Sequence, residues 1–310
     1  EVITDQVWLA SLFPNADESA ASLLAYLTSV ECQKKLSQQG LYTAREDLRL
    51  YATGTEGAME SAAGRALTAI NAYLEKKNAE NPAYAYNLFQ IMVTAVLKTI
   101  TLRPKMNRFI ANKTMYQRNE VTASFTVKKI FHDDGGEALA KIKTTGKETI
   151  DSIHDEIYRQ VSFCRSEEKD PSTASMDILQ KLPDLLLKLV GVVARFLDRH
   201  GWMPQSIIAT DPFYSSAVLA NLGSIGMRAG YHHLTNWGTC SVFCVVGEIK
   251  KRPIYDAEGR MQVRECVDLG LTIDERLADG YYYSKSVKLL KHLLENPELL
   301  ELPLDQEVDY

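Results

Sequence analysis

The sequence is poor in cysteine and has no cysteine pattern typical of a disulfide framework or a structural zinc site. Five cysteines occur among 310 residues, an odd number, and no two of them have the C-x-x-C spacing of a zinc knuckle. Cys240 and Cys244 share one face of an expected strand, where they are read as small buried side chains. We therefore expect free thiols, no metal and a cytoplasmic location, where thiols stay reduced.

An excess of positive charge is also lacking. The chain has 35 lysines and arginines against 40 aspartates and glutamates, which gives a net charge of −5. Proteins that bind nucleic acids carry a basic face, because contacts to the phosphate backbone supply much of the affinity. No nucleic-acid partner is therefore expected.

No apolar run is long enough to cross a bilayer without a charge, so no membrane span is expected. The nearest candidate, Leu182–Leu197, is interrupted by Pro183, Asp184, Lys188 and Arg195. This segment predicts a largely buried amphipathic helix. The alternative is a helix that lies on a membrane surface or docks a partner.

What the chain does contain is the composition of a globular protein, with 45% hydrophobic and 24% charged residues. We expect a helical N-terminal extension over residues 1–60, a linker and helix over 61–80, and one main domain over 81–305. Helical spacing from Pro82 to Leu102 stops before Pro104, which cannot continue a helix. Further periodic runs predict strands at Arg108–Ala111 and Val121–Phe131 and helices at Thr149–Cys164 and Met176–His200. Later strands and a final helix complete an α+β pattern, a mixed sheet with helices on one side.

A charged turn near the C-terminus is the most specific motif. Asp274-Glu275-Arg276-Leu277-Ala278-Asp279-Gly280 follows a strand-like run and precedes a helical run from Tyr281 to Leu294. This order resembles the D-H-R-x-x-D-G signature of the dihydrolipoamide acyltransferases of 2-oxo acid dehydrogenase complexes and of chloramphenicol acetyltransferase. Where those families carry a histidine, this chain has Glu275.

Upstream segments resemble the same families in the same order. Val218–Gly226 is similar to their S-N-L-G strand, Gly238–Ile249 to the strand that follows, and Leu102–Phe109 to the segment where a helix ends at a proline. The resemblance covers roughly residues 81–300. It implies a chloramphenicol acetyltransferase-like sandwich and a homotrimer whose active-site tunnel lies between subunits. It also implies coenzyme A, as acyl-CoA, or a lipoyl thiol as substrate.

The resemblance also assigns roles within the turn. The histidine of those families is the general base that removes the proton of a thiol or hydroxyl acceptor, and its position here is Glu275. Asp279 takes the place of the aspartate that holds an arginine, and Gly280 that of the glycine at the tight turn. Asp274 and Arg276 match the flanks of the base and shape the turn.

Glu275 has two interpretations. A carboxylate in a dry tunnel becomes more basic and can replace imidazole as the base. Alternatively the position has drifted, and the protein is a catalytically inactive homologue that acts as a ligand-binding or scaffolding trimer. The first interpretation predicts an enzyme that transfers an acyl group from a thioester to a thiol or hydroxyl acceptor, both of them small molecules.

The sequence also leaves more than one candidate for the group that donates a hydrogen bond to the oxyanion of the tetrahedral intermediate. The serine of the S-N-L-G motif falls on Ala220, which has no hydroxyl, so Asn221, Ser224, Thr239 or a backbone N–H are the candidates in or near the tunnel. Of the adjacent His232 and His233, at most one can face a given site. Three roles are open for this pair: one imidazole lies in or near the tunnel, the rings have a structural hydrogen-bonding role, or they bind a metal together with Asp211 or Glu248. Metal binding is the least favoured of the three. The other histidines are expected at the surface or at helix ends: His132, His154, His200 and His292.

Overall fold

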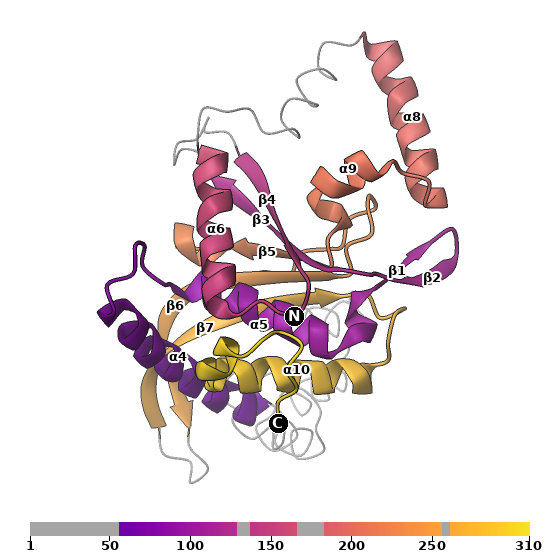
Figure 1. Ribbon diagram of the computed structural model, residues 1–310. Helices are drawn as coiled ribbons and strands as arrows, with labels where there is room; N and C mark the ends of the chain where they lie inside the picture. The colour runs from indigo at the N-terminus through magenta and orange to yellow at the C-terminus, as the bar shows by residue number, and fades with distance from the viewer. Residues whose placement is uncertain (1–55, 129–136, 166–182, 256–260) are drawn as a thin grey trace, which may run out of the picture. The chain divides into compact units, whose positions relative to one another are not determined.

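The computed structural model describes residues 56–128, 137–165, 183–255 and 261–310 (Figure 1). Most of the expected N-terminal extension, residues 1–55, lies outside the described residues, and so do residues 176–182 at the start of an expected helix. The chain divides into two compact units: Ala66–Lys250 with Val267–Tyr310, and Glu1–Arg65 with Lys251–Cys266. The larger unit holds the elements that position the candidate site.

The main sheet is mixed and has the strand order β4-β3-β5-β6-β7. Strand β3 (Val121–Lys128) pairs antiparallel with β4 (Glu137–Thr144) and parallel with β5 (Ala217–Asn221), which in turn pairs parallel with β6 (Val242–Tyr255). Strand β7 (Met261–Ile273) follows β6, and both strands extend into the smaller unit. The expected α+β fold with a mixed sheet is confirmed.

A separate hairpin of β1 (Arg108–Ala111) and β2 (Thr114–Gln117) precedes the main sheet. Strand β2 is absent from the sequence-based prediction. Asn112 and Lys113 join the two strands with φ values of 47° and 61°. Two consecutive residues in the left-handed region are typical of a two-residue hairpin turn, which asparagine favours.

The helices of the larger unit differ in how deeply they are buried. They include α4 (Glu56–Ala79, which begins in the smaller unit), α5 (Leu88–Leu102), α6 (Ile150–Arg165), α8 (Asp184–His200), α9 (Gln205–Thr210) and α10 (Gly280–Glu295). Short 3-10 turns lie at η2 (Pro104–Asn107), η3 (Pro212–Tyr214), η4 (Leu222–Ile225) and η5 (Pro297–Glu301). Helix α5 is the central one, because every residue from Gln90 to Ile100 is buried. Its start is a capping box in which Asn87 Oδ1 accepts from Gln90 N at 3.4 Å and Gln90 Oε1 accepts from Asn87 N at 2.7 Å.

The two faces of the sheet pack against different partners. Alternate residues of a strand point to opposite faces. Ala123, Phe125, Leu219 and Cys244 belong to the main core together with apolar residues of α5, α6 and α10. Their neighbours along the strands, Val218, Phe243 and Val245, form a second cluster with Ala220, Leu222, Ala229, Leu234 and Cys240. Helices therefore cover one face, and the irregular segment 222–240 covers the other.

Two glycines allow that segment to lie directly on the strands. A Cβ atom on Gly247 of β6 would lie 2.4 Å from the backbone nitrogen of Ala229. A Cβ atom on Gly270 of β7 would lie 2.3 Å from the carbonyl oxygen of Gly230. Both contacts are closer than any side chain permits, so only glycine fits at these two strand positions.

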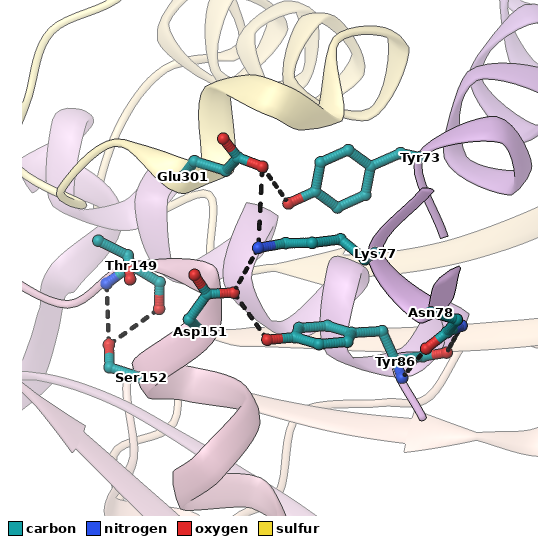
Figure 2. A network of polar contacts seen from close by, with 8 residues as sticks. All are labelled: Tyr73, Lys77, Asn78, Tyr86, Thr149, Asp151, Ser152 and Glu301. Carbon is teal, nitrogen blue, oxygen red and sulfur yellow. Dashed lines mark hydrogen bonds and ion pairs between the residues drawn. The ribbon is translucent and has the colours of Figure 1, made fainter. Parts of the chain in front are cut away.

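A polar network ties α4 to α6 and η5 (Figure 2). The Lys77 ammonium lies 2.8 Å from Asp151 and 3.8 Å from Glu301. Tyr86 donates its hydroxyl hydrogen to Asp151 at 2.7 Å, and Tyr73 donates to Glu301 at 3.1 Å. One lysine thus pairs with two acidic side chains that are far apart in the sequence, and each acid also accepts a hydrogen bond from a tyrosine.

His154 lies beside this network and is buried, which corrects the expectation of a surface position. Only 2% of its surface is exposed. Its ring stacks on Tyr86 with ring centroids 3.8 Å apart and on Tyr84 at 4.6 Å. Burial lowers the pKa of His154 below its ordinary value of 6.5, although Asp155 and Asp151 oppose that shift and Lys77 adds to it. The imidazole is therefore held in its neutral form.

This environment predicts a pH-dependent contribution to stability. The unfolded chain takes up a proton at His154 more readily than the folded one, so stability falls as the pH drops below about 6.5, by at most ~1.4 kcal/mol per pH unit for one proton. Replacing His154→Phe should flatten the free energy of unfolding between pH 6.5 and 5, as measured by urea denaturation. His292→Gln is the matched control and should keep the slope. An unchanged slope in His154→Phe would contradict the prediction.

Candidate functional site

The charged turn between β7 and α10 is held by Asp274. Its carboxylate accepts from Arg276 at 2.8 Å from Nε, 2.6 Å from Nη2 and 3.1 Å from the backbone nitrogen. Burial raises the pKa of Asp274, but the hydrogen bonds from Arg276 outweigh that effect and bring the pKa below its ordinary value. The carboxylate is therefore ionised and clamps the arginine in two-pronged geometry.

The backbone of Asp274 fixes the turn to its surroundings. Its N–H donates to the Ser241 carbonyl at 3.1 Å, next to the start of β6. Its own carbonyl accepts from the Tyr283 hydroxyl at 2.8 Å, from the first turns of α10. Burial and the nearby Asp274 carboxylate raise the pKa of Tyr283 to about 12, so the hydroxyl keeps its proton and donates. Strand, turn and helix are thereby joined at one residue.

Asp279 caps the helix that follows. Its carboxylate accepts from Tyr282 N at 2.8 Å, as an N-cap aspartate does. The side chain is exposed in the single chain, and its pairing with an arginine, expected from the resemblance, stays a prediction. Gly280 has open space where a Cβ would lie and no left-handed φ, so the turn of the single chain does not require glycine there.

Glu275 lies exposed at the surface of this turn. Within the described part of the chain its carboxylate has no hydrogen bond or ion pair. Its neighbours Asp274 and Arg276 bind each other instead. The turn therefore presents Glu275 outward as a free carboxylate.

The end of β5 provides two candidates for the oxyanion. Asn221 accepts from Ser224 N at 3.2 Å through its side chain, and Ser224 Oγ donates to the Asn221 carbonyl at 2.7 Å. Both side chains are thus used within the 3-10 turn η4. Ser224 has no hydroxyl hydrogen left for an oxyanion while this bond is kept.

Thr239 is held by a partly buried arginine that the sequence analysis did not single out. Arg118 donates to the Thr239 carbonyl, to Thr239 Oγ1 at 2.9 Å and to the Tyr214 carbonyl at 3.0 Å. Its guanidinium also lies over the Phe109 ring, 4.7 Å from the centroid. Burial lowers the pKa of Arg118 to about 10. No sequence signal marks this residue, because an isolated arginine before a strand is usually exposed.

Two aspartates complete this second group of contacts. Asp198, from α8, accepts from the Tyr214 hydroxyl at 2.5 Å and from Gly238 N at 3.2 Å. Asp211 accepts from Trp237 Nε1 at 2.6 Å and from Phe213 N at 2.8 Å, so its carboxylate anchors a loop. Gly238 has φ 78°, and a Cβ there would lie 2.4 Å from the Phe213 carbonyl oxygen. The chain before β6 is therefore fixed on both sides of Thr239.

The histidine pair belongs to the segment that covers the sheet. His232 stacks on Phe243 with centroids 4.0 Å apart, and its Nδ1 donates to the His233 carbonyl at 2.8 Å. Both rings are exposed. In the described ranges no group of three possible metal ligands is found.

Residues 211–302, from η3 through η5, match the family model of the 2-oxoacid dehydrogenases acyltransferase (catalytic domain). No curated protein sequence matches the chain. The resemblance inferred from the charged turn is confirmed over this C-terminal stretch.

Solved structures show the fold. A probable dihydrolipoamide acetyltransferase from Listeria monocytogenes is 20% identical, with 76% of this chain and 80% of that chain covered and a TM-score of 0.52. The cubic core of a pyruvate dehydrogenase multienzyme complex is 16% identical, covering 75% and 79%, with a TM-score of 0.52. Dihydrolipoamide acetyltransferase of Azotobacter vinelandii, 17% identical with the same coverage and TM-score, has been studied for a catalytic serine, a histidine and an asparagine four residues after it. The expected acyltransferase sandwich is therefore the fold of this chain.

The partly buried arginine generates a prediction about stability. Arg118→Met should destabilise the protein by about 2–4 kcal/mol, because the carbonyls of Tyr214 and Thr239 and the Thr239 hydroxyl lose their donor inside the protein. Urea denaturation measures the change. Arg159→Met, which removes an exposed ion pair with Glu156, is the control and should change stability by less than about 1 kcal/mol. Equal effects of the two substitutions would contradict the role given to Arg118.

Proposed function

We propose that this protein is an acyltransferase that moves an acyl group from a thioester to a thiol or hydroxyl acceptor, with Glu275 as the base. One observation carries the proposal. The turn that holds the base in similar proteins is kept as a locked structure, by Asp274, Arg276 and Tyr283, and it presents an unpaired carboxylate at the position of the base.

The chemistry assigns one proton transfer to Glu275. Its carboxylate accepts the proton of the acceptor thiol or hydroxyl as the sulfur or oxygen attacks the thioester carbonyl. The tetrahedral intermediate then collapses, the carbon–sulfur bond of the donor breaks, and the leaving thiolate takes the proton back. Acyl-CoA or an acyl-lipoyl group fits this donor role as a substrate.

Glu275 needs cover to act as this base. A carboxylate in water is a weak base towards a thiol, and removal of water makes it stronger. In the single chain the side chain is exposed. We infer that neighbouring copies cover it in a homotrimer, with the substrate tunnel between them. The location of this trimer in the cytoplasm is part of the same proposal, and no helix within the described ranges is long and apolar enough to cross a membrane.

Among the side chains named for the oxyanion, we favour Thr239. Its hydroxyl oxygen accepts from Arg118, and its hydroxyl hydrogen has no acceptor in the described part of the chain. It precedes by two residues the Ser241 carbonyl that binds Asp274 N, so it lies on the chain beside the charged turn. An N–H of a partly buried arginine that binds a hydroxyl oxygen makes that hydroxyl a better donor.

The rival proposal is a catalytically inactive homologue that binds a ligand or scaffolds a partner. Ala220 favours it, because the serine of the similar motif is missing. The two proposals differ in turnover. Calorimetric titration with acetyl-CoA tests binding, and release of free coenzyme A thiol tests transfer.

Substitutions at Glu275 provide the test of the proposed function. Glu275→Gln should lower thiol release from acetyl-CoA by roughly 100- to 10,000-fold, since the amide keeps the shape but takes no proton. Glu275→His should retain or raise the rate, because imidazole is the better base near neutral pH. Glu298→Gln, an exposed carboxylate on η5, is the matched control and should leave the rate unchanged.

The contrary outcome is specific. A wild-type protein that releases no thiol, binds no acetyl-CoA and gains nothing from Glu275→His supports the inactive homologue instead.

A further inference from the structure

Helix α8 has an exposed apolar surface of unusual width. At 100° per residue its apolar side chains cover about 220° of the circumference, and the charged ones gather in the remaining arc. No residue of α8 is buried, and Leu185 is 80% exposed. This finding corrects the expectation of a largely buried helix. The exposed apolar residues of the helix are Leu185, Leu186, Leu187, Leu189, Val190, Val192, Val193 and Phe196.

The C-terminal end of α8 is hydrogen-bonded to neighbouring segments of the larger unit, to which the helix belongs. The Arg199 carbonyl accepts from Asn112 N at 3.1 Å, in the hairpin of β1 and β2. Asp198 binds Tyr214, and Gly201 ends the helix in the left-handed conformation. The helix is thus fixed at its C-terminal end, while no residue of its apolar arc is buried within the described part of the chain.

An aromatic side chain extends this arc past the end of the helix. Trp202 is 63% exposed, and its ring lies 5.3 Å from that of His200 and 6.0 Å from that of Phe196, between centroids. Tryptophan and phenylalanine at the edge of an apolar surface are typical of side chains that sit at the boundary between lipid headgroups and acyl chains.

The polar arc of α8 carries positive charge. Lys188, Arg195 and Arg199 fall within about 40° of one another on the helix. Of the two acidic residues, Asp198 is engaged by Tyr214 and Gly238, which leaves Asp184 at the N-terminal end. The whole chain has a net charge of −5, so this basic stripe is a local exception. It is complementary to an anionic surface.

We propose that α8 lies in the plane of an anionic membrane surface, with its apolar arc among the outer parts of the acyl chains and its basic stripe at the lipid phosphates. The helix has 17 residues, which is about 25 Å of helix, too short to span the roughly 30 Å of hydrocarbon. The exposed side chains of its arc are aliphatic or aromatic and need no directional partner, since His200, which also falls in the arc, is bonded to the Phe196 carbonyl. The adjacent charges match acidic lipids. The family match begins at residue 211, after α8, and the inference is independent of acyl transfer.

The test is co-sedimentation of the full chain with lipid vesicles. Wild-type protein should pellet with vesicles of phosphatidylcholine and phosphatidylglycerol and bind much less to phosphatidylcholine alone. Raising the salt to about 1 M, where the Debye length is about 3 Å, should remove most of the electrostatic contribution to vesicle binding. Lys188→Gln with Arg195→Gln should weaken binding roughly 25-fold, which is about 1 kcal/mol for each basic residue.

A second double variant tests the apolar arc. Leu189→Glu with Val193→Glu should weaken binding more than about 100-fold, because two side chains can no longer enter the lipid and two negative charges are added. The matched control is Ile249→Glu, an exposed apolar residue on β6, 48% exposed, which should bind like wild type. Since all these positions are exposed, circular dichroism should show an unchanged fold in each variant. If the Leu189→Glu and Val193→Glu variant fails to fold, the Lys188→Gln and Arg195→Gln variant, which removes only exposed charge, decides the outcome.

Three results would overturn the proposal. Wild-type protein could stay in solution with both kinds of vesicle, or bind neutral and anionic vesicles equally. In the third result, the wild-type protein does not bind lipid but forms an oligomer in sedimentation velocity, and the Leu189→Glu and Val193→Glu double variant does not form that oligomer. The last result would assign the arc to a second copy of the chain.

Discussion

The Asp274 carboxylate is the anchor on which the candidate site depends. It accepts hydrogen bonds from two side-chain nitrogens of Arg276. The backbone N–H of Asp274 donates to the Ser241 carbonyl, and its carbonyl accepts from the Tyr283 hydroxyl. A partly buried carboxylate that accepts two nitrogens of one guanidinium is held in a defined geometry, because both bonds fix its orientation. The direction of α10 and the exposure of Glu275 both follow from this turn. The locked turn therefore survives whether or not the residue at its centre is a base.

The two faces of the main sheet pack against different parts of the chain and have different roles. One face is the base of the main core and packs against α5, α6 and α10. The other is covered by an irregular segment that approaches the backbone at Gly247 and Gly270 and ends at Thr239, where Arg118 fixes it. Stability comes from the first face. The second face packs a smaller apolar cluster against the covering segment, and the polar contacts of Arg118 hold Thr239.

Much of the fold could be predicted from local patterns. Patterns within a single element were sufficient for the alternation in β3, the apolar period of α5 and the proline that ends α5. The charged turn could be recognised because a strand, the turn and a helix come in a fixed order. The missed features depend on tertiary contacts. The contacts of Arg118 are with residues 96 and 121 positions away, and the burial of His154 depends on Tyr84, about 70 positions away; no local period encodes such contacts. Helix α8 has the apolar pattern of a core helix, yet none of its residues is buried, because such a pattern does not specify what packs against it.

The central claim is that copies of the chain complete the site by covering Glu275. Sedimentation equilibrium at micromolar concentration measures the mass of the assembly directly, in a buffer without lipid. The account predicts a single species with three times the mass of the chain. A mass equal to one chain over the whole concentration range would contradict it, because Glu275 would then stay in bulk water, where a carboxylate is too weak a base for a thiol.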